Sequence, residues 1–202
     1  MHTNMSLFDR DGSNAFVDES DRYGLSAIAY SFIAGIMEHI KGMTAITNPL
    51  VNSYKRLVPG YEAPCYIAWS ARNRSPLIRI PSARGSGTRI ELRNPDPSAN
   101  PYLVLAVCLA AGLDGIRRGL KPPAPVDANI YELSEAERAK RGIDNLPSSL
   151  HSAILAMQDD PLVMKVLGSH IAKCYVDAKL KDWNDYRAQV TPWEIEKYFT
   201  LF

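Results

Sequence analysis

The sequence predicts an α+β fold in which an antiparallel sheet packs against helices and a helical tail follows. Three observations indicate this. Short stretches in the first half alternate in polarity, as strands do, two longer stretches carry apolar residues at helical spacing, and the last third is mostly helical in pattern. With 46% hydrophobic residues among 202, the chain can bury a sizeable core.

The first 47 residues predict a strand, a turn and a helix. A short strand opens the chain, and the polar stretch 9–14 that follows is rich in the Asp, Asn and Gly typical of turns. Apolar residues then recur at helical spacing, at Ile28, Phe32, Ile36 and Ile40. We therefore expect an amphipathic helix over 26–44 that ends before Asn48 and Pro49.

The next segment predicts a loop and then the sheet. Residues 48–64 have loop composition, whereas 66–69, 77–80 and 89–93 alternate apolar and other residues. A Gly/Ser-rich connection at 82–87 joins the last two strands, which favours antiparallel pairing.

The rest of the chain is expected to be helical. A helix opens at 96–98 and runs to Gly119, where a proline-rich stretch ends it. From Leu133 onward the pattern is helical, with breaks near Gly142 and before Pro192.

Charge and cysteine content limit the partners and the cellular location that we expect for the protein. The 23 basic and 22 acidic residues leave a net charge of +1, so composition gives no reason to expect nucleic acid or anionic membrane as a partner. The apolar stretch 25–47 contains charged residues, and 102–113 is too short to cross a bilayer. Three widely spaced cysteines fit neither a disulfide framework nor a zinc site, which predicts a cytoplasmic protein: Cys65, Cys108 and Cys174.

Arginines gather in the predicted strands. Only one carboxylate, Glu91, lies among six of them: Arg72, Arg74, Arg79, Arg84, Arg89 and Arg93. Guanidinium groups match phosphate and carboxylate groups in pairs of hydrogen bonds, so the cluster predicts a site for polyphosphate and an anionic substrate. A nucleic-acid contact or a solvated charged face is the open alternative.

Strand periodicity predicts where these groups point. Arg89, Glu91 and Arg93 should share one face while Ile90 and Leu92 point into the core. A carboxylate flanked by two cations stays ionised, as a ligand of a hard cation must. A cross-strand ion pair on an exposed sheet is the alternative.

Two further features are ambiguous on their own. The loop 48–64 surrounds a single acid, Glu62, and could act either as a lid or as an ordinary surface loop. His2 lies in the first strand, but only Glu91 presents itself as a partner, too few for a dedicated metal site. The other histidines are interpreted as packing or surface residues: His39, His151 and His170.

Several long motifs, in order, resemble bacterial type I glutamine synthetase. They are 48–64, 70–75 and 89–103, and 1–7 is similar to the family's strand with a metal-binding histidine. The resemblance covers essentially the whole chain. It implies that 1–202 is the C-terminal portion of the family's catalytic domain, including part of its barrel. The N-terminal β-grasp domain and the first part of the catalytic domain are not among these residues.

The family joins ammonia to L-glutamate with ATP through γ-glutamyl phosphate, using Mg²⁺ or Mn²⁺, in cytoplasmic dodecamers. The resemblance implies that His2 and Glu91 bind metal and that Glu62 is the flap acid that takes a proton from ammonium. Glutamate and the transferring phosphoryl group would be held by Arg56, Arg74 and Arg93, together with Glu62. The ATP contacts would come from Ser6, Arg74, Arg79 and Arg89, and the catalytic pair would be Glu62 and Arg74.

The same resemblance sets limits. Other metal carboxylates and an aspartate from a neighbouring subunit precede residue 1 in the family, so these residues alone are expected to be inactive. Tyr131 lies where some members are adenylylated, but its flanking residues are closer to the class controlled by feedback inhibition, and we do not expect modification. Two other functions stay open: a ligase for another amine, and an inactive module for oligomerisation or regulator binding.

Overall fold

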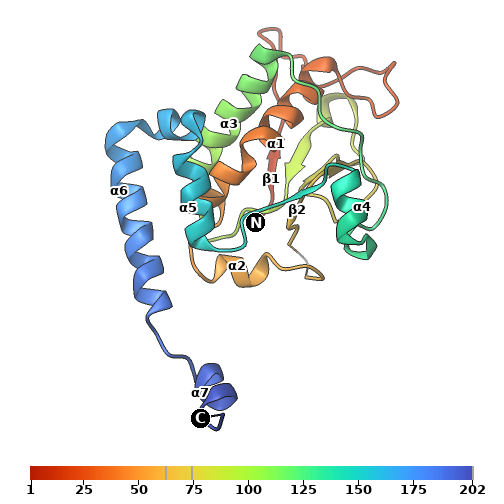
Figure 1. Ribbon diagram of the computed structural model, residues 1–202. Helices are drawn as coiled ribbons and strands as arrows, with labels where there is room; N and C mark the ends of the chain where they lie inside the picture. Colours follow the sequence, from red (N-terminus) through yellow and green to blue (C-terminus); the bar gives the residue numbers. More distant parts are fainter. Residues whose placement is uncertain (62, 74, 202) are drawn as a thin grey trace.

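The computed structural model describes residues 1–61, 63–73 and 75–201. Three helices form one layer of the core (Figure 1): α1 (Ala27–Thr47), α3 (Pro101–Arg118) and α5 (Leu150–Gln158). A small sheet lies beside them, and apolar residues of both layers form one continuous core that includes Phe32, Ile36 and Ile90. The α+β class predicted from the sequence is confirmed.

The sequence explains where the helices α1 and α3 begin. Ser26 caps α1 because its side chain accepts a hydrogen bond from the Ala29 amide, and the helix runs three residues beyond the expected end. The helix α3 starts at Pro101 rather than at 96–98, since the Asp96 carboxylate instead accepts a hydrogen bond from the Ser98 amide and forms a turn.

The helices α1 and α3 touch through their backbones. A Cβ atom on Gly35 would lie 2.1 Å from the carbonyl oxygen of Ala111, and one on Gly115 would lie 2.1 Å from that of Ser31. Only glycine permits so close an approach. This contact fixes the spacing of the helical layer on which the sheet rests.

The main sheet has four short strands, in the order β1 (Thr3–Met5), β5 (Ile90–Leu92), β4 (Ile78–Arg79) and β3 (Trp69–Ser70). The pairs β1–β5 and β5–β4 are antiparallel as expected, but β4 and β3 are parallel. The expected strand over 66–69 divides at Ala68, because β2 (Tyr66–Ile67) pairs with β6 (Asp144–Asn145) in a separate sheet. The strand β6 was not predicted.

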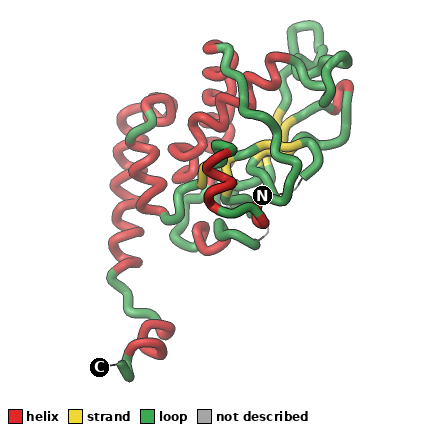
Figure 2. Tube along the Cα trace, turned by 45° about the vertical axis from the view of Figure 1, so that its right-hand side comes forward, coloured by secondary structure: helices red, strands yellow, loops and turns green. Residues whose placement is uncertain are grey.

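Short elements surround this core. They are α2 (Ser53–Arg56), α4 (Glu135–Lys140) and the 3₁₀ helices η1 (Gly85–Gly87) and η2 (Ile130–Glu132). The tail consists of α6 (Pro161–Arg187) and α7 (Pro192–Tyr198), and α6 breaks at Gly168, whose φ of 70° is left-handed. Figures 1 and 2 show α7 standing apart from the body of the molecule. Within the described residues, every helix is too short or too polar to span a bilayer.

The structure corrects the interpretation of His39 as a packing or surface residue. Its Nδ1 lies 2.8 Å from Asp160 Oδ2 and its Nε2 lies 3.2 Å from Asp114 Oδ2, so the ring joins α1 to α3 and to the start of α6. The hydrogen bond to Asp160, supported by that to Asp114, raises the pKa of His39 against the opposing effect of burial. Both partners are distant in sequence, which is why spacing did not reveal them.

Candidate active site

Glu91 is the centre of the candidate site. Its side chain is only 3% exposed, and the strand register places it opposite Asn4 on β1 and Arg79 on β4. Arg79 donates two hydrogen bonds to Glu91 Oε2, with Nε at 2.7 Å. His2 Nδ1 lies 2.6 Å from Oε1, and Arg93 Nε lies 3.8 Å from the same oxygen. We call these four residues the Glu91 cluster.

His2 is neutral near pH 7 in this environment. Burial, reinforced by nearby cations such as Arg93, lowers the pKa of His2 more than the Glu91 carboxylate raises it. A neutral imidazole beside a carboxylate carries its proton on the nitrogen that faces the acid, here Nδ1. Nε2 therefore keeps its lone pair, as a metal ligand must.

One of the two cations that flank Glu91 differs from the predicted pair, whereas Arg93 is at its predicted place. Ile90 and Leu92 are fully buried as expected, but the place predicted for Arg89 beside the acid belongs to Arg79. Arg89 instead donates from Nε to Asn4 Oδ1 at 3.0 Å. Strand periodicity gives the face of a side chain, but the register between strands decides which neighbour it meets.

Arg56 lies at the end of α2, the short helix within the predicted lid loop. It donates from Nη2 to the backbone oxygen of Asn94, while its buried Nε has no hydrogen-bond partner among the described residues. Burial lowers the pKa of the Arg56 guanidinium, and the Asp96 carboxylate opposes this effect. A buried N–H group without a partner can donate to a ligand.

Three predicted site residues remain: Ser6, Glu62 and Arg74. Ser6 is half-buried, one residue beyond β1. Glu62 and Arg74 lie outside the described residues.

A cavity of about 580 Å³ opens beside the Glu91 cluster. Polar and aromatic side chains from five separate parts of the chain line it: His2, Tyr61, Asn73, Ser75, Arg93, Asn129 and Tyr131. Sequence reasoning placed His2 and Arg93 at a site but missed the two tyrosines as lining groups. Tyr61 precedes Glu62, the predicted flap acid, in the sequence, and this was the available signal.

His2 and Glu91 would supply only part of a metal site. In the described portion of the chain, no group of three or more His, Cys, Asp or Glu side chains could hold a cation. His2 and Glu91 provide two donors, whereas hard divalent cations take about six ligands. The pair fits a cation whose remaining ligands come from a substrate or from other protein groups.

Comparisons with known proteins identify the family of this chain. The family model described as glutamine synthetase, catalytic domain, matches residues 1–198. A glutamine synthetase of Clostridium saccharobutylicum is 60% identical over all 202 residues, and one of Thermus thermophilus is 55% identical. A solved structure titled "GmaS/ADP complex-Conformation 1" matches with a TM-score of 0.87 at 38% identity over 98% of this chain.

This chain spans 45% of the length of each of these two relatives and 45% of the solved chain. The match nevertheless covers every strand and nearly all of the helical tail. The chain therefore belongs to the glutamine synthetase catalytic-domain family.

Proposed function

We propose that the protein containing this chain ligates ammonia to L-glutamate at the expense of ATP. The γ-carboxylate of glutamate attacks the γ-phosphorus of ATP and ADP leaves. Ammonia then attacks the acyl carbon of γ-glutamyl phosphate, phosphate leaves, and L-glutamine remains. The observation that carries the proposal is the buried Glu91 cluster beside a cavity of about 580 Å³, in a chain of this family.

The metal role falls to His2 and Glu91. Mg²⁺ or Mn²⁺ would be held by Nε2 of the neutral imidazole and by the carboxylate, with the remaining ligands supplied by ATP phosphates and by groups beyond these residues. When bound, such a cation neutralises phosphate charge. Arg79 is hydrogen-bonded to Glu91 and is therefore close enough to neutralise more of the phosphate charge.

The arginines divide between two anionic substrates. Arg79 and Arg89, with Arg74, would contact the ATP phosphates, and Ser6 would lie at the nucleotide. The solved relative titled as an ADP complex supports a nucleotide site in this fold. Arg56 and Arg93, again with Arg74, would hold glutamate and the transferring phosphoryl group. The unpaired buried Nε of Arg56 and the place of Arg93 on the cavity wall support this division.

Glu62 would supply the base. Ammonium carries no lone pair, so a proton must leave before its nitrogen can attack, and a carboxylate over a closed cavity can accept that proton. The neighbouring residue Tyr61 lines the cavity, which supports placing the acid at this site.

The tail supports assembly into a homo-oligomer, a dodecamer by resemblance to the family. Large apolar side chains are exposed around α7, with Phe199 at 79% and Trp193 at 61%. An apolar surface of this kind is typical of subunit interfaces. The three free cysteines support a cytoplasmic, reducing location.

The test uses the full-length gene product and two variants. The wild-type protein should form glutamine from glutamate, ammonium and ATP. It should form much less product when methylamine or putrescine replaces ammonium, because its relatives of 54–60% identity are named glutamine synthetase. Glu91→Gln should lower activity by about a hundredfold or more, since it removes a charged metal ligand. Glu38→Gln, an exposed helix position, is the matched control. Preference for the larger amines would favour the alternative ligase.

A further inference from the structure

Tyr131 lies on a turn that is hydrogen-bonded to Asn73 and Ser75, in the loop that follows β3. Ile130 is fully buried, and its amide donates to Ser75 Oγ at 3.3 Å. Asn73 Nδ2 donates to the carbonyl oxygen of Ala128 at 2.5 Å. The Asn129 side chain accepts from the Tyr131 amide at 3.2 Å and so caps η2. The backbone that carries Tyr131 is therefore fixed to the cavity wall.

The hydroxyl of Tyr131 reaches across to the predicted flap. It lies 3.2 Å from the carbonyl oxygen of Tyr61 and 3.4 Å from that of Ala63, and a phenol donates its one proton to such acceptors. These two carbonyl groups belong to the residues on either side of Glu62 in the sequence. Burial raises the pKa of the Tyr131 hydroxyl, so it remains a donor at neutral pH.

The ring of Tyr131 has its own support. It packs against Tyr66 on β2, with ring centroids 5.7 Å apart and an angle of 55° between the planes. Within the flap, the Tyr61 amide donates to the carbonyl oxygen of Val58 at 3.3 Å, which closes the turn at Gly60. Tyr131 thus joins this turn to the strand β2.

We propose that Tyr131 is a positioning residue whose hydroxyl holds the flap through the backbone of Tyr61 and Ala63, and so keeps the flap in place beside the cavity while ammonia reacts. This rests on the proposed function. Without the hydroxyl, the flap opens more often, and γ-glutamyl phosphate meets water before it meets ammonia. Water then replaces the amine as nucleophile and returns glutamate and phosphate. Phosphoryl transfer itself, which Tyr131 does not touch, continues.

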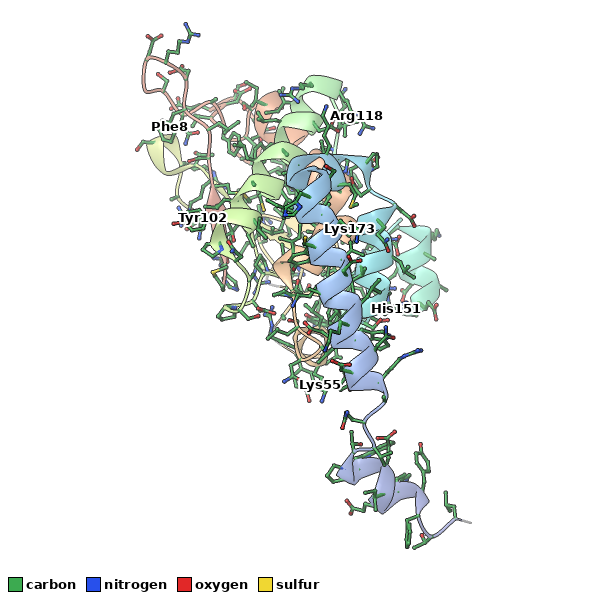
Figure 3. All side chains as sticks on the ribbon, turned by 90° about the vertical axis from the view of Figure 1, so that its left-hand side faces the viewer. Phe8, Lys55, Tyr102, Arg118, His151 and Lys173 are labelled. Carbon is green, nitrogen blue, oxygen red and sulfur yellow. The ribbon has the colours of Figure 1, made fainter. Side chains whose placement is uncertain are left out.

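The test compares Tyr131→Phe with wild type in the full-length gene product. Phenylalanine keeps the ring contact with Tyr66 and removes only the hydroxyl. The glutamine formed per phosphate released should fall about three- to tenfold at limiting ammonium, the effect of one neutral hydrogen bond, while the KM for ATP stays unchanged. Tyr102→Phe is the matched control, because Tyr102 is 83% exposed at the start of α3 (Figure 3).

Hydrogen exchange of the peptide 57–65 provides a readout without turnover. Exchange should be faster in Tyr131→Phe than in wild type and unchanged in Tyr102→Phe. Equal exchange in all three proteins would show that the hydroxyl does not hold the flap. Faster exchange with an unchanged product ratio would refute the positioning role. A wild-type protein that forms no glutamine would instead overturn the proposed function, while the exchange comparison still decides whether Tyr131 holds the flap.

Discussion

Replacing Arg93 by lysine separates charge from geometry at the cavity. In the structure Arg93 Nε lies 3.8 Å from Glu91 Oε1, and Nη1 donates to the carbonyl oxygen of Pro76 at a long 3.4 Å. Lysine keeps the positive charge beside Glu91 but lacks the planar fork of the guanidinium group. The paired hydrogen bonds to a substrate carboxylate should be lost, which costs about 1.5–3 kcal/mol.

That cost corresponds to a rise of about ten- to a hundredfold in the glutamate KM, because each 1.4 kcal/mol is about a factor of ten. Steady-state assays of the full-length protein should show this rise with a much smaller change in the ATP KM. Arg118→Lys is the control, since Arg118 pairs with Asp114 at the far end of α3. An unchanged glutamate KM in Arg93→Lys would refute the assignment of Arg93 to glutamate.

Four other perturbations have expected outcomes. Glu62→Ala should slow glutamine formation more than γ-glutamyl phosphate formation in rapid-quench experiments, and equal losses would argue for a phosphate-site role. The 202 residues expressed alone should release no phosphate from ATP, because two donors fall short of the about six ligands of a divalent cation; robust turnover would contradict this. Gly35→Ala should lower stability to denaturant by about 3 kcal/mol or more, since its Cβ would lie 2.1 Å from a carbonyl oxygen, whereas Ser169→Ala on exposed α6 should change it little. His39→Gln should destabilise the protein most below about pH 6.5 and progressively less as pH rises through the raised pKa of His39. The reason is that the wild-type hydrogen bonds to Asp160 and Asp114 are strongest when the ring is protonated. A loss in denaturation midpoint that grows with pH would contradict this prediction.

The sequence predicted local structure well where the signal was local. The helix α1, its end before Pro49 and the inward faces of Ile90 and Leu92 all follow from periodicity and capping within a few residues. The same reasoning placed Glu91 among arginines. It named Arg89 as a flanking cation, because spacing along one strand is visible in the sequence.

Features that depend on distant segments were missed. The pairing of β2 with β6 brings residues near 66 against residues near 144, and the break at Ala68 follows from that pairing. The placement of Arg79 beside Glu91 needs the register of β4 against β5. His39 meets Asp160 across more than a hundred residues. Contacts between such distant segments produce no periodic pattern of residues in the sequence, so the sequence alone does not predict them.

A buried polar network connects the helical layer to Arg56, which we propose holds glutamate. Asn48, the cap of α1, donates from Nδ2 to the Asn94 carbonyl oxygen at 2.8 Å, and Asn94 Nδ2 donates to Thr47 Oγ1 at 2.8 Å. The same Asn94 carbonyl accepts from Arg56. Because Thr47, Asn48 and Asn94 are fully buried, breaking one of these bonds leaves an unpaired group that costs about 1–3 kcal/mol. The end of α1 and the Arg56 guanidinium are therefore coupled, so a shift in helix packing at Gly35 should change glutamate binding at the proposed site as well as the stability of the fold.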